Sequence, residues 1–261
     1  MENGCSREEI REFYIDHDKI PLHMKLSYPP SPLENGKCPL LILQHGFTGH
    51  MEEPHLLAFE EAARRQGYAV LRSELYGHGM SGGAFKDHTI LKWVSEMMTV
   101  IDYARSLDFV SDLYLSGHSQ GGLVAALAGS MKQDVLKGLL LLSPALMIPE
   151  DARRGNLLGM TFDPENIPDS LQMDDRVLGG NYVRAAQFVQ VEPVIRRFRK
   201  KVLIVHGDAD ESVPIQVALD AADLYSDVEL EVIPGDTHCF DNHLDQAADA
   251  VGRFLGRMKE A

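Results

Sequence analysis

The sequence predicts an α/β fold built on a mostly parallel sheet. Two observations favour this class. Short apolar runs alternate with longer stretches whose apolar residues recur at helical spacing. Most of the short runs are continuously apolar, which is typical of strands buried on both faces of a parallel sheet. A chain of 261 residues with 44% hydrophobic content is long enough to bury one large core.

Eight strands are expected, and the first two form an antiparallel hairpin that ends at the proline-rich loop Pro29–Pro32. The expected strands are Phe13–Asp16, Leu22–Tyr28, Leu40–Leu43, Tyr68–Leu71, Asp112–Leu115, Leu139–Leu142, Val202–Val205 and Val228–Val232. In the last of them apolar and acidic residues alternate, which predicts a half-exposed strand near the edge of the sheet.

The helices expected between these strands each carry one apolar face, and a small-residue helix is expected over Leu123–Ala128. The residues of the three amphipathic faces are Leu56, Phe59, Ala63; Ile90, Val94, Met97, Ile101, Ala104; and Leu244, Ala247, Ala248, Val251, Leu255, Met258. These faces are expected to cover the sheet.

One connection is longer than a crossover between parallel strands needs. It joins the strands that end at Leu142 and begin at Val202, and only Tyr182–Gln190 within it is predicted to be helical. We interpret residues 144–199 as an inserted lid over the carboxyl ends of the strands, on a core of residues 1–143 and 200–261. The alternative is a passive surface loop.

Composition narrows the range of partners and compartments. A net charge of −14 argues against nucleic acid, which requires a basic face. No apolar run approaches the ~20 residues that span a bilayer, and the polar Met1–Glu9 lacks the layout of a signal peptide, so a cytoplasmic protein with no membrane partner is expected. The cysteines Cys5, Cys38 and Cys239 are too scattered for a disulfide framework.

Gly117–Gly121 is a G-x-S-x-G motif between an expected strand and an expected helix. The glycines suit a sharp turn where a side chain would collide with the neighbouring strand or helix. Such a turn raises the hydroxyl of Ser119 above the sheet, at the positive end of a helix. Ser119 is therefore the expected nucleophile, the alternative being a helix-capping serine in a glycine-rich turn.

A serine nucleophile needs a base, and a strand–serine–helix motif of this kind is followed first by the acid and then by the histidine. Of the eleven histidines, only His238 and His243 lie beyond the last expected strand. His238 stands in the loop before the final helix and is the expected general base, whereas His243 is expected to be solvated. For the acid, spacing alone leaves Asp208, Asp210 and Glu211 open.

The oxyanion of the transition state requires backbone donors near the nucleophile. Position in the fold predicts two such donors. One is the N–H of Gln120, which follows the nucleophile, and the other is the N–H of Phe47, in the loop after the strand Leu40–Leu43. The sequence has no phosphate-binding glycine motif and no His/Asp/Glu set at metal-ligand spacing, so neither a cofactor nor a metal is expected.

These segments resemble the α/β-hydrolase superfamily and, more narrowly, the bacterial cinnamoyl (feruloyl) esterases. The narrower resemblance lies in His45–His50, Tyr76–Gly79, Gly117–Gly122, Phe162–Pro168, Gly180–Arg184 and Gly235–Cys239. It implies the α/β-hydrolase fold with a small lid. The family pattern H-G-x-x-D-x-x-V-P, here residues 206–214, places the acid at Asp210.

The same resemblance implies that lid groups, here Asp151 and Tyr182, contact the phenolic ring of the substrate. Where some relatives carry glutamine or tryptophan in the lid, this insertion has Leu157–Leu158 and Gln172–Met173. The expected function is hydrolysis of hydroxycinnamic esters through an acyl-enzyme. Alternatives on the same triad are a monoacylglycerol lipase, thioesterase, acyltransferase or proline-releasing aminopeptidase, and a more distant one is a non-catalytic binding protein. The expected partner is a small-molecule ester, and a homodimer is one oligomeric state that the sequence leaves open.

Overall fold

The computed structural model describes residues 10–31, 33, 35–173 and 175–260. The polar run Met1–Glu9 and the thiol of Cys5, on which sequence predictions were made, lie outside the described residues. Among the described helices, none is both long enough and apolar enough to cross a lipid bilayer.

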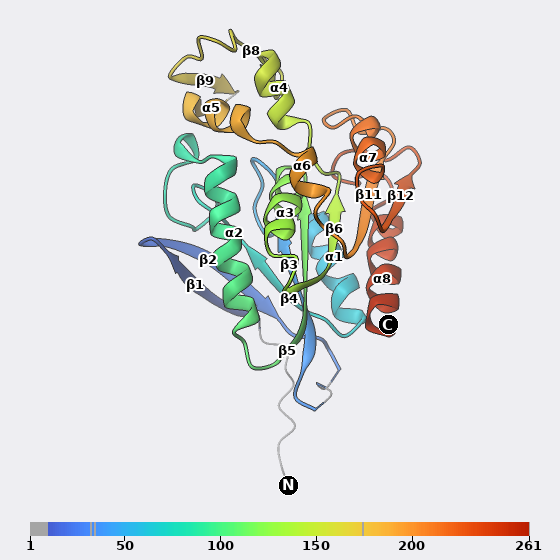
Figure 1. Ribbon diagram of the computed structural model, residues 1–261. Coiled ribbons are helices and arrows are strands. Elements are labelled where there is room, and N and C mark those ends of the chain that lie inside the picture. The colour runs from blue at the N-terminus through green and yellow to red at the C-terminus, as the bar shows by residue number, and fades with distance from the viewer. Residues whose placement is uncertain (1–9, 32, 34, 174, 261) are drawn as a thin grey trace.

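A central sheet of eight strands, in the order β1-β2-β4-β3-β5-β6-β11-β12, organises the chain (Figure 1). β1 pairs with β2, and β2 with β4, in antiparallel fashion, whereas all other neighbours are parallel. The strands are β1 Arg11–His17, β2 Ile20–Ser27, β3 Cys38–Gln44, β4 Ala69–Ser73, β5 Val110–His118, β6 Leu136–Leu142, β11 Lys201–Gly207 and β12 Val228–Ile233. The predicted α/β class with a mostly parallel eight-stranded sheet is confirmed.

Helices cover both faces of the sheet and divide the core in two. Because side chains alternate along a strand, Leu41 and Leu43 of β3 pack with α1 (Pro54–Arg65) and α8 (Leu244–Glu260). Leu40 and Ile42 point to the other face, where the apolar sides of α2, α3 and α7 lie. These last helices span Ile90–Arg105, Gln120–Met131 and Ile215–Ala222.

The small-residue helix α3 is buried along nearly its whole length, since every residue from Gln120 to Ser130 is shielded from solvent. Its glycines and alanines allow it to lie close to β5, β6 and α2. On its neighbour α2, the hydroxyl of Thr89 accepts from the N–H of Lys92 and caps the amino end. Close packing of α3 matters for the site because Ser119 precedes its first residue.

The insertion between β6 and β11 contains more structure than the sequence indicates. In addition to α5, which corresponds to the predicted helix, it forms two further helices and two short hairpins. Its elements are α4 Ile148–Arg154, β7 Asn156–Leu157, β8 Met160–Thr161, β9 Ser170–Met173, β10 Arg176–Gly179, α5 Gly180–Phe188 and α6 Glu192–Ile195. Figure 1 shows α4, α5 and β9 beyond one end of the sheet. Tyr182, Val183 and Ala186 of α5 belong to the same apolar cluster as the sheet.

Candidate active site

Ser119 occupies a strained turn between β5 and α3. Its φ of 56° and ψ of −121° are values that non-glycine residues rarely adopt. The turn is anchored on both sides: the N–H of Ser119 donates to the carbonyl of Leu142 at 2.9 Å, and its carbonyl accepts from Ala145 at 3.0 Å. The end of β6 therefore holds the serine backbone at the carboxyl edge of the sheet.

The two glycines that flank this turn have no room for a side chain. A Cβ on Gly117 would lie 2.1 Å from the carbonyl oxygen of Gly121, and a Cβ on Gly121 would lie 2.3 Å from that of His45. Both distances are well inside van der Waals contact with backbone atoms that cannot move aside. The steric reason for the G-x-S-x-G pattern is thus visible at both positions.

His238 and Asp210 are hydrogen-bonded. Nδ1 of His238 donates to Oδ2 of Asp210 at 2.7 Å, while Oδ1 of the same carboxylate accepts the N–H groups of Ser212 and Val213, each at 2.8 Å. The Asp210 side chain is fully shielded from solvent, and that of His238 is 20% exposed. Because Nδ1 carries the hydrogen, Nε2 of His238 is the nitrogen left with a lone pair.

A second histidine supports the carboxylate. Nε2 of His206 donates to the carbonyl of Val213 at 2.8 Å and lies 3.3 Å from Oδ2 of Asp210. Burial by itself raises the pKa of Asp210, but the hydrogen bonds from His206 and His238 outweigh it and hold that pKa well below its usual range. Asp210 is therefore a carboxylate at neutral pH, as an orienting group for histidine must be.

The other residues considered for these roles lie elsewhere. Oδ1 of Asp208 accepts the N–H of Gly235 at 2.6 Å and so joins the loop after β11 to the loop after β12. Glu211 is exposed. His243 directly precedes α8 and its carbonyl accepts from Gln246 and Ala247.

The residue before the nucleophile connects Ser119 to the histidine loop. Nε2 of His118 donates to the carbonyl of His238 at 2.9 Å, and the two imidazole rings lie 4.8 Å apart between centroids. Burial keeps the pKa of His118 well below its ordinary value. The neutral, buried imidazole of His118, the residue directly before Ser119, thus holds the backbone of His238 in place.

Two backbone N–H groups flank the serine. Gln120 is the first residue of α3, so its N–H has no intrahelical acceptor. On the other side, a Cβ on Gly46 would lie 3.1 Å from Cβ of Ser119, which places the Gly46–Phe47 peptide beside the nucleophile. The structure therefore brings both predicted oxyanion donors to the turn that carries Ser119.

His45 fixes the orientation of that peptide. Its Nδ1 donates to the carbonyl of Gly46 at 2.7 Å. In a trans peptide the C=O of Gly46 and the N–H of Phe47 point in opposite directions, so His45 holds the N–H in one direction. Burial lowers the pKa of His45 to about 3, which keeps the ring neutral. The carbonyl of Phe47, in turn, accepts from Nε2 of His78.

The two lid residues expected to meet the substrate lie in different surroundings. Tyr182 is fully buried, its ring packs against Phe47, and its hydroxyl donates to Oε1 of Gln120 at 2.6 Å. Asp151 is partly exposed and lines a cavity of about 460 Å³ together with Leu157 of the insertion and Ser212 of the acid loop. Asp151 is thus open to a ligand, whereas the Tyr182 hydroxyl is already paired.

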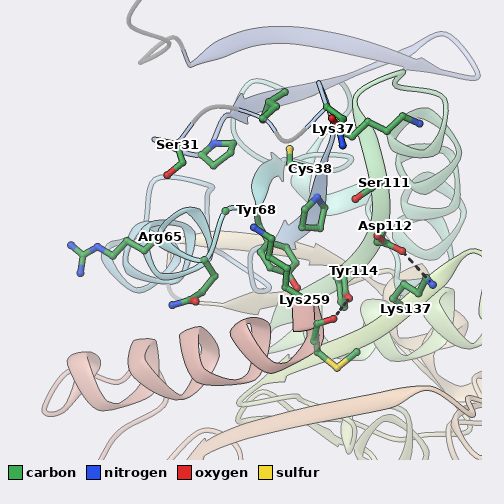
Figure 2. A pocket seen from close by; sticks show the side chains of 17 residues that line it. Ser31, Lys37, Cys38, Arg65, Tyr68, Ser111, Asp112, Tyr114, Lys137 and Lys259 are labelled. Atoms are coloured by element: carbon green, nitrogen blue, oxygen red, sulfur yellow. Dashed lines mark hydrogen bonds and ion pairs between the residues drawn. The ribbon is translucent and has the colours of Figure 1, made fainter. Parts of the chain in front are cut away.

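A larger cavity, of about 660 Å³, lies at the opposite edge of the sheet (Figure 2). Its lining includes Cys38 and Ser111, which lie at the beginning of β3 and β5. Ser119 lies at the other end of the sheet, directly after the last residue of β5. Within the cavity Lys137 lies 3.3 Å from Asp112. Its lining includes none of Ser119, Asp210 and His238, and we assign the chemistry to the carboxyl edge.

Residues 37–172 match the family described as serine aminopeptidase, S33. The matched stretch is more than half of the chain, and it includes β3, β5 and Ser119. The chain belongs to this family. As an α/β hydrolase, the protein has the fold that the sequence motifs predicted.

This α/β hydrolase is similar to three characterised or solved proteins, which differ in how much of each chain the similarity covers. Est1E from Butyrivibrio proteoclasticus, solved with ferulic acid bound, is 50% identical with a TM-score of 0.93, over 95% of this chain and 100% of that chain. Human mitochondrial palmitoyl-protein thioesterase ABHD10 is 23% identical over 207 residues, which are 76% of this chain but only 65% of that protein's length. The 2-hydroxy-6-oxo-6-(2'-aminophenyl)hexa-2,4-dienoic acid hydrolase of Metapseudomonas resinovorans is 22% identical over 262 residues, covering 87% of this chain and 88% of that protein.

These likenesses confirm the predicted membership of the α/β-hydrolase superfamily, and this chain is a serine hydrolase. The resemblance to bacterial feruloyl esterases is supported by a bacterial neighbour that binds ferulic acid. The hydrogen bonds that His45, His118 and His206 make with the nucleophile turn and the acid loop had no signal in the sequence beyond the position of these residues at strand ends.

Proposed function

We propose that this serine hydrolase is a carboxylic ester hydrolase that cleaves esters of hydroxycinnamic acids of the ferulate type. The observation that carries the proposal is the 2.7 Å bond between His238 and Asp210, in a loop tied through His118 to the strained turn of Ser119. The substrate class rests on the likeness to Est1E, whose structure holds ferulic acid.

In the proposed reaction, Oγ of Ser119 attacks the ester carbonyl while Nε2 of His238 takes its proton. Asp210 holds the imidazole in the tautomer with its hydrogen on Nδ1 and stabilises the imidazolium. The tetrahedral oxyanion accepts from the N–H groups of Phe47 and Gln120. Collapse expels the alcohol, which receives the proton from His238, and leaves an acyl-Ser119 ester.

Hydrolysis of the acyl-enzyme repeats these steps with water in place of serine. His238 removes a proton from the water, the resulting oxyanion occupies the same two donors, and Ser119 leaves with the proton. The product is the free carboxylic acid. Each bond made and broken in this scheme is accounted for by protein side chains and water.

The insertion, residues 144–199, is proposed to act as the lid that selects the acyl group. Asp151 faces a cavity between this lid and the acid loop, and a carboxylate there can accept a hydrogen bond from a phenolic hydroxyl. Asp151→Asn should therefore raise KM for methyl ferulate several-fold while leaving p-nitrophenyl acetate unchanged. Glu150→Gln, one residue earlier on α4 and likewise partly exposed, is the matched control.

The decisive assay compares kcat/KM for methyl ferulate, a short-chain aliphatic methyl ester and a palmitoyl thioester. We expect methyl ferulate to be preferred by at least about tenfold, which corresponds to ~1.4 kcal/mol of extra transition-state binding. Ser119→Ala should abolish turnover and labelling by a fluorophosphonate. A preference for the thioester would instead favour the activity named for ABHD10, and retained turnover in Ser119→Ala would remove the mechanism.

A further inference from the structure

Behind the proposed general base lies a second cluster of reactive side chains. One ring nitrogen from each of His55 and His118, together with Sγ of Cys239, all lie within 4.8 Å of one another. The two rings are 4.3 Å apart between centroids. Both histidines are 3% exposed, and Cys239 is partly buried. The three residues come from α1, the end of β5 and the loop before α8.

Each histidine has a buried nitrogen without a hydrogen-bond partner among the described residues: Nε2 in His55 and Nδ1 in His118. In His118 the other nitrogen, Nε2, already donates to the carbonyl of His238, so Nδ1 carries the lone pair. Leaving a buried acceptor unpaired costs free energy. A cation bound between the rings removes that cost.

A carboxylate lies beside His55. Oε2 of Glu53, which also lacks a hydrogen-bond partner among the described residues, lies 3.9 Å from Nε2 of His55. Gly49 makes room for it, since a Cβ there would lie 2.4 Å from the same oxygen. Two imidazole nitrogens, one sulfur and one carboxylate oxygen are the donors that zinc and neighbouring divalent transition metals prefer.

We propose that His55, His118, Cys239 and Glu53 form a binding site for a divalent transition-metal ion of the zinc type. On binding, the thiol of Cys239 loses its proton to solvent and the thiolate becomes a ligand, while the two neutral imidazoles bind through their lone pairs. No change in oxidation state is involved. The site is separate from the serine chemistry, which uses none of these four side chains as nucleophile, base or acid.

Metal binding at this site should inhibit the hydrolase. Bond lengths of about 2.0–2.3 Å around tetrahedral zinc place its ligands roughly 3.3–3.8 Å apart, whereas the two ring nitrogens and the sulfur here lie within 4.8 Å of one another. A pair of ligands at that outer distance is drawn together by about 1.0–1.5 Å when the ion binds, and Cys239 and His118 share this movement. Cys239 follows His238, and His118 holds the carbonyl of His238. The general base moves with its two neighbours, and a displacement of about 1 Å can lower a rate ~100-fold.

Sequence spacing gave no indication of this site because its ligands are far apart along the chain. Glu53 and His55 are separated from His118 by β4 and α2, and from Cys239 by almost the whole domain. Only the pairing of β3 with β5 and the return of the loop before α8 bring them together.

The test titrates metal-free protein with Co²⁺ and follows the thiolate-to-cobalt absorption, with Zn²⁺ added afterwards to displace cobalt. We expect one Co²⁺ per chain. Cys239→Ser should lose the thiolate absorption, and His55→Gln and Glu53→Gln should weaken binding at least about tenfold, with folding checked by thermal unfolding.

Controls separate this site from other thiols and histidines. Cys5→Ser/Cys38→Ser and His243→Gln should keep the absorption and the stoichiometry. Failure to bind one equivalent, or an unchanged absorption in Cys239→Ser, overturns the site. Because this readout needs no substrate, its result is independent of the ester hydrolase proposal.

A second measurement tests the inhibition with p-nitrophenyl acetate, which reports acyl transfer without any demand on the acyl group. One equivalent of Zn²⁺ should lower kcat at least about tenfold in the natural sequence, and a chelator should restore it. Cys239→Ser should hydrolyse the ester equally with and without Zn²⁺. Stoichiometric Co²⁺ binding combined with an unchanged kcat would overturn the inhibitory coupling.

Discussion

The hydroxyl of Tyr182, from α5 of the insertion, donates a 2.6 Å hydrogen bond to Oε1 of Gln120, the residue after the nucleophile. Both side chains are fully buried. The insertion is therefore joined to the residue whose N–H is proposed to bind the oxyanion. This contact links the insertion, which is proposed to select the acyl group, to the turn that is proposed to perform the chemistry.

Tyr182→Phe tests what that bond does. Without its donor, Oε1 of Gln120 is left unpaired in a buried place, which costs about 1–3 kcal/mol and loosens the first turn of α3. We expect kcat to fall about 3- to 10-fold on methyl ferulate and on p-nitrophenyl acetate alike. A rise in KM confined to methyl ferulate would instead support the sequence prediction that Tyr182 contacts the phenolic ring.

Asp210→Asn and Asp208→Asn form a matched pair two residues apart. An amide at residue 210 no longer holds His238 in the tautomer with its hydrogen on Nδ1, so kcat should fall by about 10⁴. Asparagine at residue 208 keeps an oxygen for the N–H of Gly235, and the loss should stay below about threefold. Steady-state kinetics on one activated ester measures both, and the opposite ranking would refute the assignment of the acid.

These two aspartates also show where sequence reasoning stops. Strand β11, the glycine at its end and the loop that follows could be predicted from the sequence. Asp208 and Asp210, however, are the same residue type and lie only two positions apart in that loop. What separates them is the fold of the loop, in which the N–H groups of Ser212 and Val213 turn toward Oδ1 of Asp210. Only the resemblance to a family favoured Asp210 before the structure did.

The nucleophile turn and most of the sheet were predictable for a physical reason. Buried parallel strands need continuous apolar runs, and a strained serine turn needs glycines on both sides. The insertion was less predictable, because β7 and β8 have two residues each and α6 has four. Elements so short have too few residues to show a period, and tertiary contacts decide their conformation.

His45 offers a test of the oxyanion loop. His45→Phe keeps an aromatic ring against Trp93 but removes the donor to the carbonyl of Gly46. The N–H of Phe47 is then less firmly aligned, and kcat should fall roughly 10- to 100-fold with KM changed less than about twofold, somewhat less than the loss of a whole donor. His45→Gln, which can still donate, should recover part of the rate.

A structural role for His45 alone would give a different result from the one expected here. In that case His45→Phe and His45→Gln would lose thermal stability in proportion to their loss of rate. The amide donor of His45→Gln would then not restore any of kcat. Measuring kcat, KM and the unfolding temperature of both variants separates the two roles.

Glu96 should make the stability of the protein depend on pH. Its side chain lies on α2, is 2% exposed, and accepts the N–H of Tyr76 at 2.9 Å. Burial raises the pKa of Glu96 to about 7, whereas in the unfolded chain it is near 4.5. Between these values the folded state binds more protons than the unfolded state, so the free energy of unfolding falls as pH rises through this window and is constant above it.

Glu96→Gln removes the titration and keeps an oxygen for the N–H of Tyr76. At pH 8 we expect the variant to gain about 1–3 kcal/mol in free energy of unfolding, the upper value being the shift in pKa converted at ~1.4 kcal/mol per unit. At pH 5.5 the gain should shrink, because the natural glutamate is then largely protonated in the folded state. Urea unfolding at the two pH values measures this, with the exposed Glu192→Gln as control. Equal stability changes at both pH values would show that Glu96 does not titrate as its burial requires.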